Sequence, residues 1–382
     1  MTGYKKIAIV YDWMDKWGGV ERVLLTLNEM FPKATFFTSY YNPKKAYWAK
    51  HLNINQSFIG KIPKFIKDSR IFSVILYPLA FESFNFNDFD LVISVTSSYA
   101  KSIITSPNTK HICYLLTPTR FLWSHQDDYL KKYVQYANFY IKYLKNWDLI
   151  AAQRPDKIIS ISETVSRRCE KYYGRESGVV YPPFDLEYWK NIRNIISDIK
   201  FQPDKKWQSD LRSKILNSKF YLIVSRLEPY KKIDLVISLF KKFKKKLLIV
   251  GEGTQRNYLR SISDDNIHFF SKLTDLELGF LYSKAEALLM PQEEDFGYVS
   301  LEAQFFGCPV IAFGKGGAVE TVIEDKTGIL FNNQNVGDLR QAVERFEMIK
   351  YNLKLNMPKL VPSNLKRFSK MDFIKNFLNC IE

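Results

Sequence analysis

The sequence predicts an α/β fold made of two Rossmann-like domains that face each other across a central cleft. Short apolar runs alternate with helical patterns along nearly the whole chain of 382 residues, as in parallel sheets whose strands are joined by crossover helices. The alternation breaks once, between Asp185 and Ser218, and the length fits two domains of roughly 100 to 200 residues each. The expected strands are residues 7–11, 91–94, 111–115, 157–161, 221–224, 247–250, 287–290 and 309–312.

The break in the alternation gives the domain boundaries. Trp, Lys, Asp and Asn crowd this stretch, and Pro203 lies inside it. After it, the apolar run 221–224 leads through a polar turn to the run 233–237, much as 7–11 leads through a glycine-rich turn to 20–27. We expect an N-terminal Rossmann-like domain over 1–187, a linker or insert over 188–218, a C-terminal Rossmann-like domain over 219–365, and a C-terminal helix over 366–382 that packs back toward the N-terminal domain.

The charge balance predicts an anionic partner. The chain has 56 Lys and Arg against 40 Asp and Glu, a formal net charge of +16, which fits nucleic acid, acidic lipid or a phosphorylated substrate. The four cysteines lie far apart with no CxxC pair, which argues against a zinc site and a disulfide framework. No apolar run approaches the roughly 20 residues that span a bilayer, and the N-terminal run is too short for a signal peptide. We therefore expect a cytoplasmic protein.

A strand-to-helix turn near the N-terminus contains the adjacent glycines Gly18 and Gly19. Two glycines let the backbone approach a ligand closely, and free N–H groups at the start of the following helix favour an anion. A tight turn that needs positive φ would also select glycine.

The corresponding turn of the second half carries Arg226 and Lys231 after a predicted strand. A guanidinium and an ammonium at the carboxyl end of a strand can share a diphosphate, although surface cations are usually only solvated. Gly251 and Gly253 follow the next strand, but Arg256 stands where a dinucleotide fingerprint needs a third glycine. This second turn therefore predicts a generic loop that contacts phosphate or base, not a nicotinamide site.

Residues 290–303 concentrate acidic side chains at a strand-to-helix junction. The helix is expected to begin near Gly297, so Glu294 precedes it and Glu302 lies inside it. Ionised carboxylates only accept hydrogen bonds, so they suit hydroxyl-rich ligands such as a sugar ring or a ribose. The preference of acids for helix N-termini explains the acids before the helix, but it does not explain Glu302.

These residues together resemble a known family. Glu294 and Glu302 enclose seven residues, and the chain resembles, over nearly its whole length, the retaining glycosyltransferases of family 4, with their GT-B fold and Glu-x7-Glu motif. Residues 117–123, 151–156 and 181–185 are similar to bacterial mannosyltransferase-like enzymes of polysaccharide and O-antigen assembly. The other matching pieces occur in the family's order: Gly18-Gly19, Arg226 and Lys231, Gly251-Glu252-Gly253, residues 314–320 and residues 327–330.

The resemblance implies a reaction and a site. Residues 1–187 would bind the acceptor, and residues 219–365 would bind the nucleotide sugar. A sugar, with mannose from GDP-mannose as the first expectation, would pass from a nucleotide diphosphate to a glycan or lipid-linked acceptor with retention at the anomeric carbon. Arg226 and Lys231 would hold the donor diphosphate. Glu302 would take the ribose hydroxyls, and Glu294 would hold the transferred sugar. The other donor-binding residues that the family implies are Gly18, Gly19, Gly251, Gly253, Phe296 and Gly297.

One position departs from the family pattern. A His that faces the transferred sugar normally precedes the Thr-Pro pair, and this chain has Leu116 there. Leu can neither hydrogen-bond a hydroxyl nor carry a proton. A different or deoxy donor sugar, a neighbour such as His125 taking over, or reduced activity would each account for it. Arg120 follows the Thr-Pro pair and is expected near the sugar or the acceptor.

The family needs no metal, and we expect no metal and no cofactor besides the donor. Asp88-Phe89-Asp90 precedes its strand, whereas metal-binding Asp-x-Asp motifs follow one. The four histidines are scattered, and no two of them stand at ligand spacing.

A basic stretch near residue 65 indicates a second kind of partner. Lys61, Lys64, Lys67 and Arg70 recur every three residues among apolar side chains. Such a stretch fits peripheral contact with an anionic membrane surface, and it equally fits a solvated helix face over the domain core.

Two other functions compete with the glycosyltransferase. A nucleic-acid-binding protein would account for the net charge, but the chain lacks an RNA-recognition signature, a zinc knuckle or a compact basic helix, so we expect no nucleic acid. A catalytically weak sugar-nucleotide-binding protein would account for Leu116.

Overall fold

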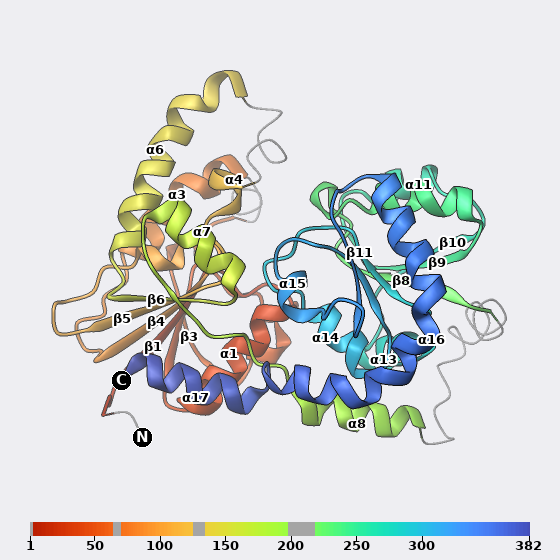
Figure 1. Ribbon diagram of the computed structural model, residues 1–382. Coiled ribbons are helices and arrows are strands. Elements are labelled where there is room, and N and C mark those ends of the chain that lie inside the picture. The colour runs from red at the N-terminus through yellow and green to blue at the C-terminus, as the bar shows by residue number, and fades with distance from the viewer. Residues whose placement is uncertain (1–2, 64–69, 125–133, 198–217) are drawn as a thin grey trace. The chain divides into compact units, whose positions relative to one another are not determined.

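The chain folds into two compact units (Figure 1). Unit 1 contains residues 1–183 and 370–382, and unit 2 contains residues 184–369. Both units are α/β, with a parallel sheet in each, as the sequence predicts. The computed structural model describes residues 3–63, 70–124, 134–197 and 218–382.

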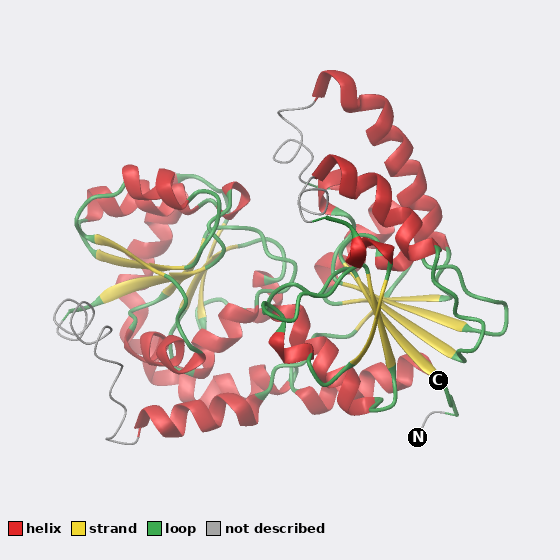
Figure 2. Cartoon of the chain, turned by 180° about the vertical axis from the view of Figure 1, so that it is seen from behind, coloured by secondary structure: helices red, strands yellow, loops and turns green. Residues whose placement is uncertain are grey.

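Unit 1 is built on a seven-stranded parallel sheet in the order β3-β2-β1-β4-β5-β6-β7. Every residue of β1 and β4 is buried, because helices cover both faces of the sheet (Figure 2). The strands are β1 (Ile7–Tyr11), β2 (Thr35–Thr38), β3 (Asn53–Gln56), β4 (Leu91–Thr96), β5 (Lys110–Leu115), β6 (Lys157–Ser160) and β7 (Gly178–Val179).

The C-terminal helix of the chain packs within unit 1. Lys370 Nζ lies 2.5 Å from the Glu29 carboxylate of α1, and the rings of Phe373 and Phe377 contact Tyr114 of β5 edge-on. The helices of unit 1 are α1 (Gly19–Met30), α3 (Arg70–Glu82), α4 (Arg120–Trp123), α6 (Val134–Gln153), α7 (Glu163–Tyr173) and α17 (Lys370–Ile381), with 3₁₀ turns η1 (Tyr47–Ala49), η2 (Phe58–Lys61) and η3 (Ala100–Ser102).

Unit 2 is built on a six-stranded parallel sheet in the order β10-β9-β8-β11-β12-β13. The strands are β8 (Phe220–Val224), β9 (Lys246–Val250), β10 (Ile267–Phe270), β11 (Leu288–Met290), β12 (Val310–Phe313) and β13 (Gly328–Phe331). The helical elements are α8 (Leu186–Ser197), η5 (Pro229–Lys231), α11 (Ile233–Phe243), α12 (Arg256–Ser261), α13 (Asp275–Lys284), α14 (Tyr298–Phe305), α15 (Ala318–Thr321) and α16 (Val336–Lys366).

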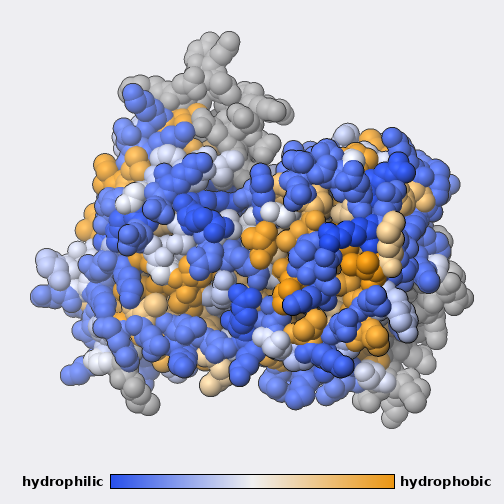
Figure 3. Space-filling view, in the orientation of Figure 1, coloured by the Kyte–Doolittle hydropathy of each residue, from blue (hydrophilic) through white to orange (hydrophobic). Residues whose placement is uncertain are grey.

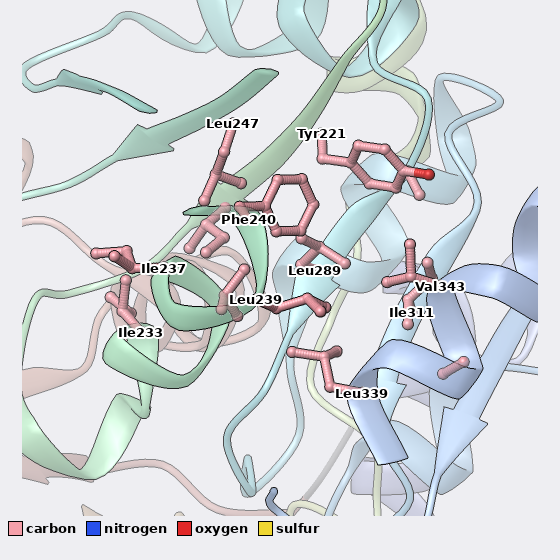
Figure 4. Close-up of a cluster of buried hydrophobic side chains, with 14 of the residues drawn as sticks. Tyr221, Ile233, Ile237, Leu239, Phe240, Leu247, Leu289, Ile311, Leu339 and Val343 are labelled. Atoms are coloured by element: carbon pink, nitrogen blue, oxygen red, sulfur yellow. The ribbon is translucent and has the colours of Figure 1, made fainter. Parts of the chain in front are cut away.

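Side chains of alternate residues of β8 pack into two separate hydrophobic cores of unit 2, one on each face of the sheet. Tyr221 points to the face covered by α11 and α16, where it packs against Phe240 and Leu247 (Figure 4). Phe220 and Leu222 point to the opposite face. A strand buried on both faces has a continuous apolar sequence, which is why 221–224 is recognisable as a strand before the structure is known.

The expected strands match β1, β4, β5, β6, β8, β9, β11 and β12 within one or two residues. The other five were not predicted. Among them, β3 reads Asn-Ile-Asn-Gln and is largely exposed at the sheet edge, and β7 has only two residues. Edge and very short strands carry little apolar patterning, because they bury little surface.

The expected linker needs correction. Unit 2 begins at Phe184, and residues 186–197 form α8 within it. This helix packs on α13: a Cβ placed on Gly279 would lie 2.9 Å from Ile196 and 3.1 Å from Ile192. The stretch lacks a strand pattern because it is an amphipathic helix that lies on unit 2. The remainder of the expected linker, from residue 198 to 217, lies outside the described residues.

Among the described residues, no helix is both long and apolar enough to cross a membrane. The face of the molecule drawn in Figure 3 is largely hydrophilic, with scattered hydrophobic patches.

Candidate functional site

The strand order of unit 2 creates a switch point between β8 and β11. The chain moves outward from β8 to β9 and β10 on one side, and from β11 to β12 and β13 on the other. Open α/β sheets bind ligands at such a point, beyond the carboxyl ends of the strands. The turn after β8 carries Arg226 and Lys231, and the turn after β11 carries Glu294. The topology therefore brings the predicted cations and a predicted carboxylate to the same edge of the sheet.

Lys231 and Glu294 form an ion pair at this switch point. Lys231 Nζ lies 2.5 Å from Glu294 Oε1, and the two side chains are only 7% and 16% exposed. Gln292 Nε2 donates a second hydrogen bond to the same oxygen at 2.7 Å. Low exposure to water limits the screening of the two charges. The pair thus fixes a cation and a carboxylate side by side.

Arg226 lies in the same turn but takes a different position. Its side chain is exposed, and Nη2 donates to the Tyr230 hydroxyl at 2.7 Å. The guanidinium also lies 6.0 Å from the centre of the Tyr230 ring. Tyr230 therefore orients a fork of N–H donors on the surface of the turn.

Gly251 and Gly253 follow β9 and pack against the turn that carries Arg226 and Lys231, where no larger residue would fit. A Cβ on Gly251 would lie 1.8 Å from the Ser225 carbonyl oxygen, and its φ is +156°. A Cβ on Gly253 would lie 2.4 Å from the Leu227 carbonyl oxygen. The predicted donor-binding glycines therefore allow the chain after β9 to pack directly against the turn that carries Arg226 and Lys231.

A second glycine pair supports the loop of Glu294. The Glu294 backbone bridges to Gly316, and Gly317 N–H donates to the Glu294 carbonyl at 2.7 Å. A Cβ on Gly316 would lie 2.2 Å from that carbonyl oxygen, and one on Gly317 would lie 2.3 Å from the Phe296 carbonyl oxygen. The glycines after β12 thus let the acidic loop lie directly on the next loop along the sheet.

Helix α14 begins where the sequence predicts. Gly297 precedes its first residue with φ +91°, a conformation that favours glycine, and the N–H groups around Gly297 lie at the helix N-terminus. Glu302, inside α14, is 5% exposed, and its Oε2 accepts a hydrogen bond from the Tyr282 hydroxyl of α13 at 3.0 Å. Tyr282 therefore sets the direction of this buried carboxylate.

Unit 1 has its own switch point, between β1 and β4. Asp12 directly follows β1 and is fully buried. Its carboxylate accepts hydrogen bonds from the Thr96 hydroxyl at 2.9 Å and from the backbone N–H groups of Tyr99 and Ala100, both at 2.8 Å. Asp12 therefore ties the turn after β1 to the loop after β4.

The glycine pair of unit 1 lies at the start of α1. Gly18 is extended, with φ −171°, and neither glycine has a positive φ, so a tight turn does not explain them. A Cβ on Gly18 would lie 3.1 Å from Glu21 Oε2. Burial raises the pKa of the Glu21 carboxyl to about 7, from an ordinary value of 4.5. Gly18 and Gly19 therefore lie beside a carboxyl group, that of Glu21, whose pKa is raised to near neutrality.

Leu116 follows β5, and its N–H donates to the Thr96 carbonyl at 2.8 Å. The next residues are held by a buried cluster around Asp148, which accepts hydrogen bonds from the Thr119 hydroxyl at 2.8 Å and the Trp123 indole at 2.7 Å. Arg120, half-buried, is the first residue of α4. His125 lies outside the described residues.

The basic stretch is described only in part. Lys61 ends η2 and is exposed. Lys64 and Lys67 lie outside the described residues, as does the side chain of Arg70. In the part of the chain that the structure describes, no three His, Cys, Asp or Glu side chains gather in a way that could hold a metal ion.

Residues 205–357 match the family described as "Glycosyl transferases group 1". This part of the chain is a glycosyl transferases group 1 domain. It contains Lys231, Glu294 and Glu302 with the supporting glycines, so the residues gathered at the switch point of unit 2 are those of the matched domain. The family resemblance inferred from the sequence is confirmed at this level.

Named relatives share modest identity with the chain. A Mycobacterium tuberculosis protein named "GDP-mannose-dependent alpha-(1-6)-phosphatidylinositol monomannoside mannosyltransferase" is 30% identical over 182 residues, which are 42% of this chain and 46% of that protein. The chain therefore matches somewhat less than half the length of this relative. An "uncharacterized 41.2 kDa protein in cps region" of Klebsiella pneumoniae is 24% identical over 316 residues, 79% of this chain and 81% of that protein.

Solved structures confirm the fold. Sucrose-phosphate synthase from Thermosynechococcus elongatus has a TM-score of 0.72 at 16% identity, over 98% of each chain. Anabaena HepE in complex with UDP and glucose has a TM-score of 0.69 at 15% identity, also over 98% of each chain. The likeness covers both units, and the fold is that of the GT-B glycosyltransferases.

Sequence reasoning missed three residues of the group 1 domain that orient its charged groups. Tyr282 holds Glu302, Gln292 holds Glu294, and Tyr230 holds Arg226. Only Gln292 carried a signal, because an amide in an otherwise acidic loop two residues before Glu294 can donate to it. Tyr282 lies 20 residues before Glu302 on another helix, and nothing in the sequence pairs them.

Proposed function

We propose that this chain is a retaining glycosyltransferase that works without a metal ion and moves a sugar from a nucleotide diphosphate to a glycan or lipid-linked acceptor in cell-surface polysaccharide synthesis. The observation that carries the proposal is the Lys231–Glu294 pair at the switch point of unit 2. It puts a cation suited to phosphate beside a carboxylate suited to sugar hydroxyls. Glu302, held by Tyr282, supplies a second carboxylate for the ribose.

The proposed donor is GDP-mannose. Its support is the similarity of part of the chain to a relative named as GDP-mannose-dependent. The fold is shared with HepE, whose structures hold UDP and UDP-glucose, so uridine donors belong in any test of the donor base.

The proposed reaction needs no protein nucleophile. The bond between the anomeric carbon and the diphosphate oxygen breaks, the acceptor hydroxyl oxygen bonds to that carbon on the same face, and the acceptor's proton goes to the released diphosphate. Lys231 and Arg226 stabilise the negative charge that develops on the leaving diphosphate. Glu294 and the N–H groups ahead of α14 position the sugar.

A sugar-nucleotide-binding protein with little transferase activity is the second candidate, and Leu116 favours it. This position is held at the carboxyl end of β5 by the hydrogen bond to Thr96, and it presents an aliphatic side chain where the resembling family has an imidazole. Both candidates bind the donor, but only the transferase releases nucleoside diphosphate with turnover.

Contact with an anionic membrane and a cytoplasmic location belong to the same proposal, because a lipid-linked acceptor lies at a membrane surface. The exposed Lys61 at the end of η2 supports it. The remaining basic residues, Lys64, Lys67 and Arg70, support it from the sequence alone.

Donor binding is tested by thermal unfolding with GDP, UDP, ADP and dTDP and with their common sugar conjugates. A ligand at 100 times its Kd stabilises the folded state by about 2.7 kcal/mol, so we expect GDP and GDP-mannose to raise the Tm. Glu302→Gln should weaken nucleotide binding roughly 10- to 100-fold, because it removes a charged acceptor for the ribose hydroxyls. Glu344→Gln is the matched control, since Glu344 lies half exposed on α16 beside Arg340.

A shift with one base that Glu302→Gln reduces and Glu344→Gln leaves intact supports the donor site. If no nucleotide raises the Tm, or if both variants respond as the wild type does, the carboxylate role assigned to Glu302 is wrong. A strong shift with an oligonucleotide instead would support the nucleic-acid-binding alternative.

A further inference from the structure

Helix α16 presents a second apolar face that points away from the core of unit 2. The residues of its inner face are buried in that core: Leu339, Val343, Phe346 and Leu353. The opposite face of such a helix is ordinarily polar, because it meets water. In α16 this face carries Met348, Tyr351 and Leu355 instead, and these residues are 83%, 77% and 63% exposed.

These apolar residues belong to one continuous row along the helix. Residues three or four apart are neighbours on a helix surface. Five residues of α16 follow this spacing in turn, and we call them the outer stripe: Glu344, Met348, Tyr351, Leu355 and Lys359. Single exposed apolar side chains are normal on protein surfaces, whereas a continuous apolar patch marks an interaction surface.

The two ends of the outer stripe carry opposite charges. Glu344 lies at the end nearer the N-terminus of α16, and the exposed Lys359 lies at the other end. The Glu344 carboxylate accepts a hydrogen bond from Arg340 Nε at 2.8 Å, and its side chain stays half exposed. The outer stripe is therefore complementary in charge to a copy of itself that runs in the opposite direction.

The spacing of the outer stripe fits a two-fold axis that passes between residues 351 and 352. In a closed two-fold interface both copies use the same patch, so positions equally far from the axis face each other. Met348 and Leu355 lie equally far from this point, and so do Glu344 and Lys359. Apolar residues of the two copies therefore meet near the axis, and an acid meets a lysine at each end.

A cavity lies along one side of the outer stripe. Its volume is about 290 Å³, and its lining includes Ile349, Asn352 and Asn356, each of which directly follows a residue of the outer stripe in the sequence. Asn352 adjoins the two-fold axis, so Tyr351 of the second copy would face it. A hollow beside a row of protruding side chains lets two helices interdigitate, as ridges of one helix pack into grooves of another.

The charges beside the outer stripe favour a second copy over an anionic membrane. Besides Glu344, the N-terminal half of the stripe is flanked by the carboxylates of Glu324 and Asp325, which pair with the half-exposed Arg345. An anionic lipid surface would repel these carboxylates. A second copy instead offers Lys359 to this end of the stripe.

We propose that the outer stripe is the interface of a two-fold symmetric dimer of this chain, in which the two α16 helices lie antiparallel. The patch is small beside the 20 to 30 residues that each partner of a standard stable interface contributes, so the dimer is reversible, with a Kd of about 10 to 100 µM. The proposal does not depend on the proposed glycosyltransferase function, because the donor site lies at the switch point between β8 and β11 and shares no residue with the outer stripe.

The test is sedimentation velocity of the full chain from about 2 to about 400 µM, a range that brackets the expected Kd. We expect the sedimentation coefficient to rise with concentration from that of a monomer to that of a dimer. Tyr351→Glu should weaken the dimer at least 100-fold, because it brings two carboxylates together beside the two-fold axis. Tyr258→Glu is the matched control, since Tyr258 is an exposed tyrosine of α12 in the same unit.

Charge reversal at the two ends tests the antiparallel arrangement. Glu344→Lys and Lys359→Glu should each weaken self-association about tenfold, because like charges then face each other at both ends of the dimer. An equimolar mixture of the two variants should associate at least as well as the wild type, because the lysines of one chain then face the glutamates of the other. A role confined to the stability of the single chain would not be rescued by mixing.

A chain that stays monomeric up to about 400 µM, well above the expected Kd, would overturn the proposal. Self-association that Tyr351→Glu leaves unchanged, or that the two charge variants and their mixture share equally with the wild type, would overturn it too. Binding to phosphatidylglycerol vesicles that Tyr351→Glu abolishes, without self-association, would assign the outer stripe to a membrane instead. Thermal unfolding checks that each variant is folded, and its nucleotide-dependent shift should be the same in all of them.

Discussion

Lys231→Ala should lower kcat by about 100- to 1,000-fold while the protein stays folded, because in the proposed reaction the Lys231 ammonium stabilises the negative charge that develops on the leaving diphosphate. Lys231 Nζ is held 2.5 Å from Glu294, at the switch point of unit 2. Arg226→Ala should act in the same direction. The measurement is initial-rate kinetics with saturating donor, together with the Tm of each variant.

Lys242→Ala is the matched control, because Lys242 is an exposed lysine near the end of α11 in the same unit. A double-mutant cycle with Glu294→Gln separates the charge from the pairing. If Lys231 acts only by holding Glu294, the double variant should be no slower than Glu294→Gln alone. If Lys231→Ala and Arg226→Ala both react at the wild-type rate, these two side chains do not stabilise the leaving diphosphate.

Asp148→Ala should lower the free energy of unfolding of unit 1 by about 3 to 5 kcal/mol, because it leaves the Lys101 ammonium buried without its counter-charge. Lys101 Nζ lies 2.6 Å from Asp148 Oδ1, and neither side chain is more than 2% exposed. The other Asp148 oxygen accepts hydrogen bonds from Trp123 at 2.7 Å and Tyr173 at 2.9 Å. Urea unfolding followed by tryptophan fluorescence measures the loss, since the Trp123 indole is part of the cluster.

The pair Lys101→Met with Asp148→Leu should recover much of that stability, because apolar side chains of similar size remove both charges together. Glu344→Ala breaks the exposed pair with Arg340 on α16 and should cost only about 0.3 to 0.5 kcal/mol. A loss below about 1 kcal/mol in Asp148→Ala would show that Lys101 regains water or another partner on mutation, and that the cluster does not hold the loop from Leu116 to Arg120.

The fold class could be predicted because most strands of the two sheets are buried on both faces. Runs such as Tyr221 to Val224 are apolar without interruption, and that composition marks a strand covered by helices. Among the strands that the sequence does not predict, β3 is largely exposed at a sheet edge and β7 has only two residues. Helix α8 was taken for a linker because its contacts with α13, through Gly279, involve residues far apart in the sequence.

The sequence singles out the candidate residues that the structure brings to the switch point of unit 2, but it does not show how they pair. The sequence shows that Lys231 and Glu294 both follow strands, whereas their ion pair depends on β8 and β11 being neighbours. The sequence also assigns Gly251 and Gly253 to the donor, whereas the structure shows that the neighbouring carbonyl groups of Ser225 and Leu227 leave no room for a side chain at either position. Glu21 was overlooked because a glutamate in the first turn of a helix is common, and only the structure shows that it is buried.

We propose that the residues at the switch point of unit 2 serve glycosyl transfer with retention and without a metal. The most direct measurement is a ¹H NMR time course of the wild-type protein with GDP-mannose and UDP-glucose, each with the methyl pyranosides of glucose, galactose, mannose and N-acetylglucosamine as acceptors, in the presence of EDTA. We expect GDP to be released from GDP-mannose in step with a new glycoside that keeps the anomeric configuration of the donor. A product of inverted configuration, a strict need for a divalent cation, or no turnover of any bound donor would contradict it.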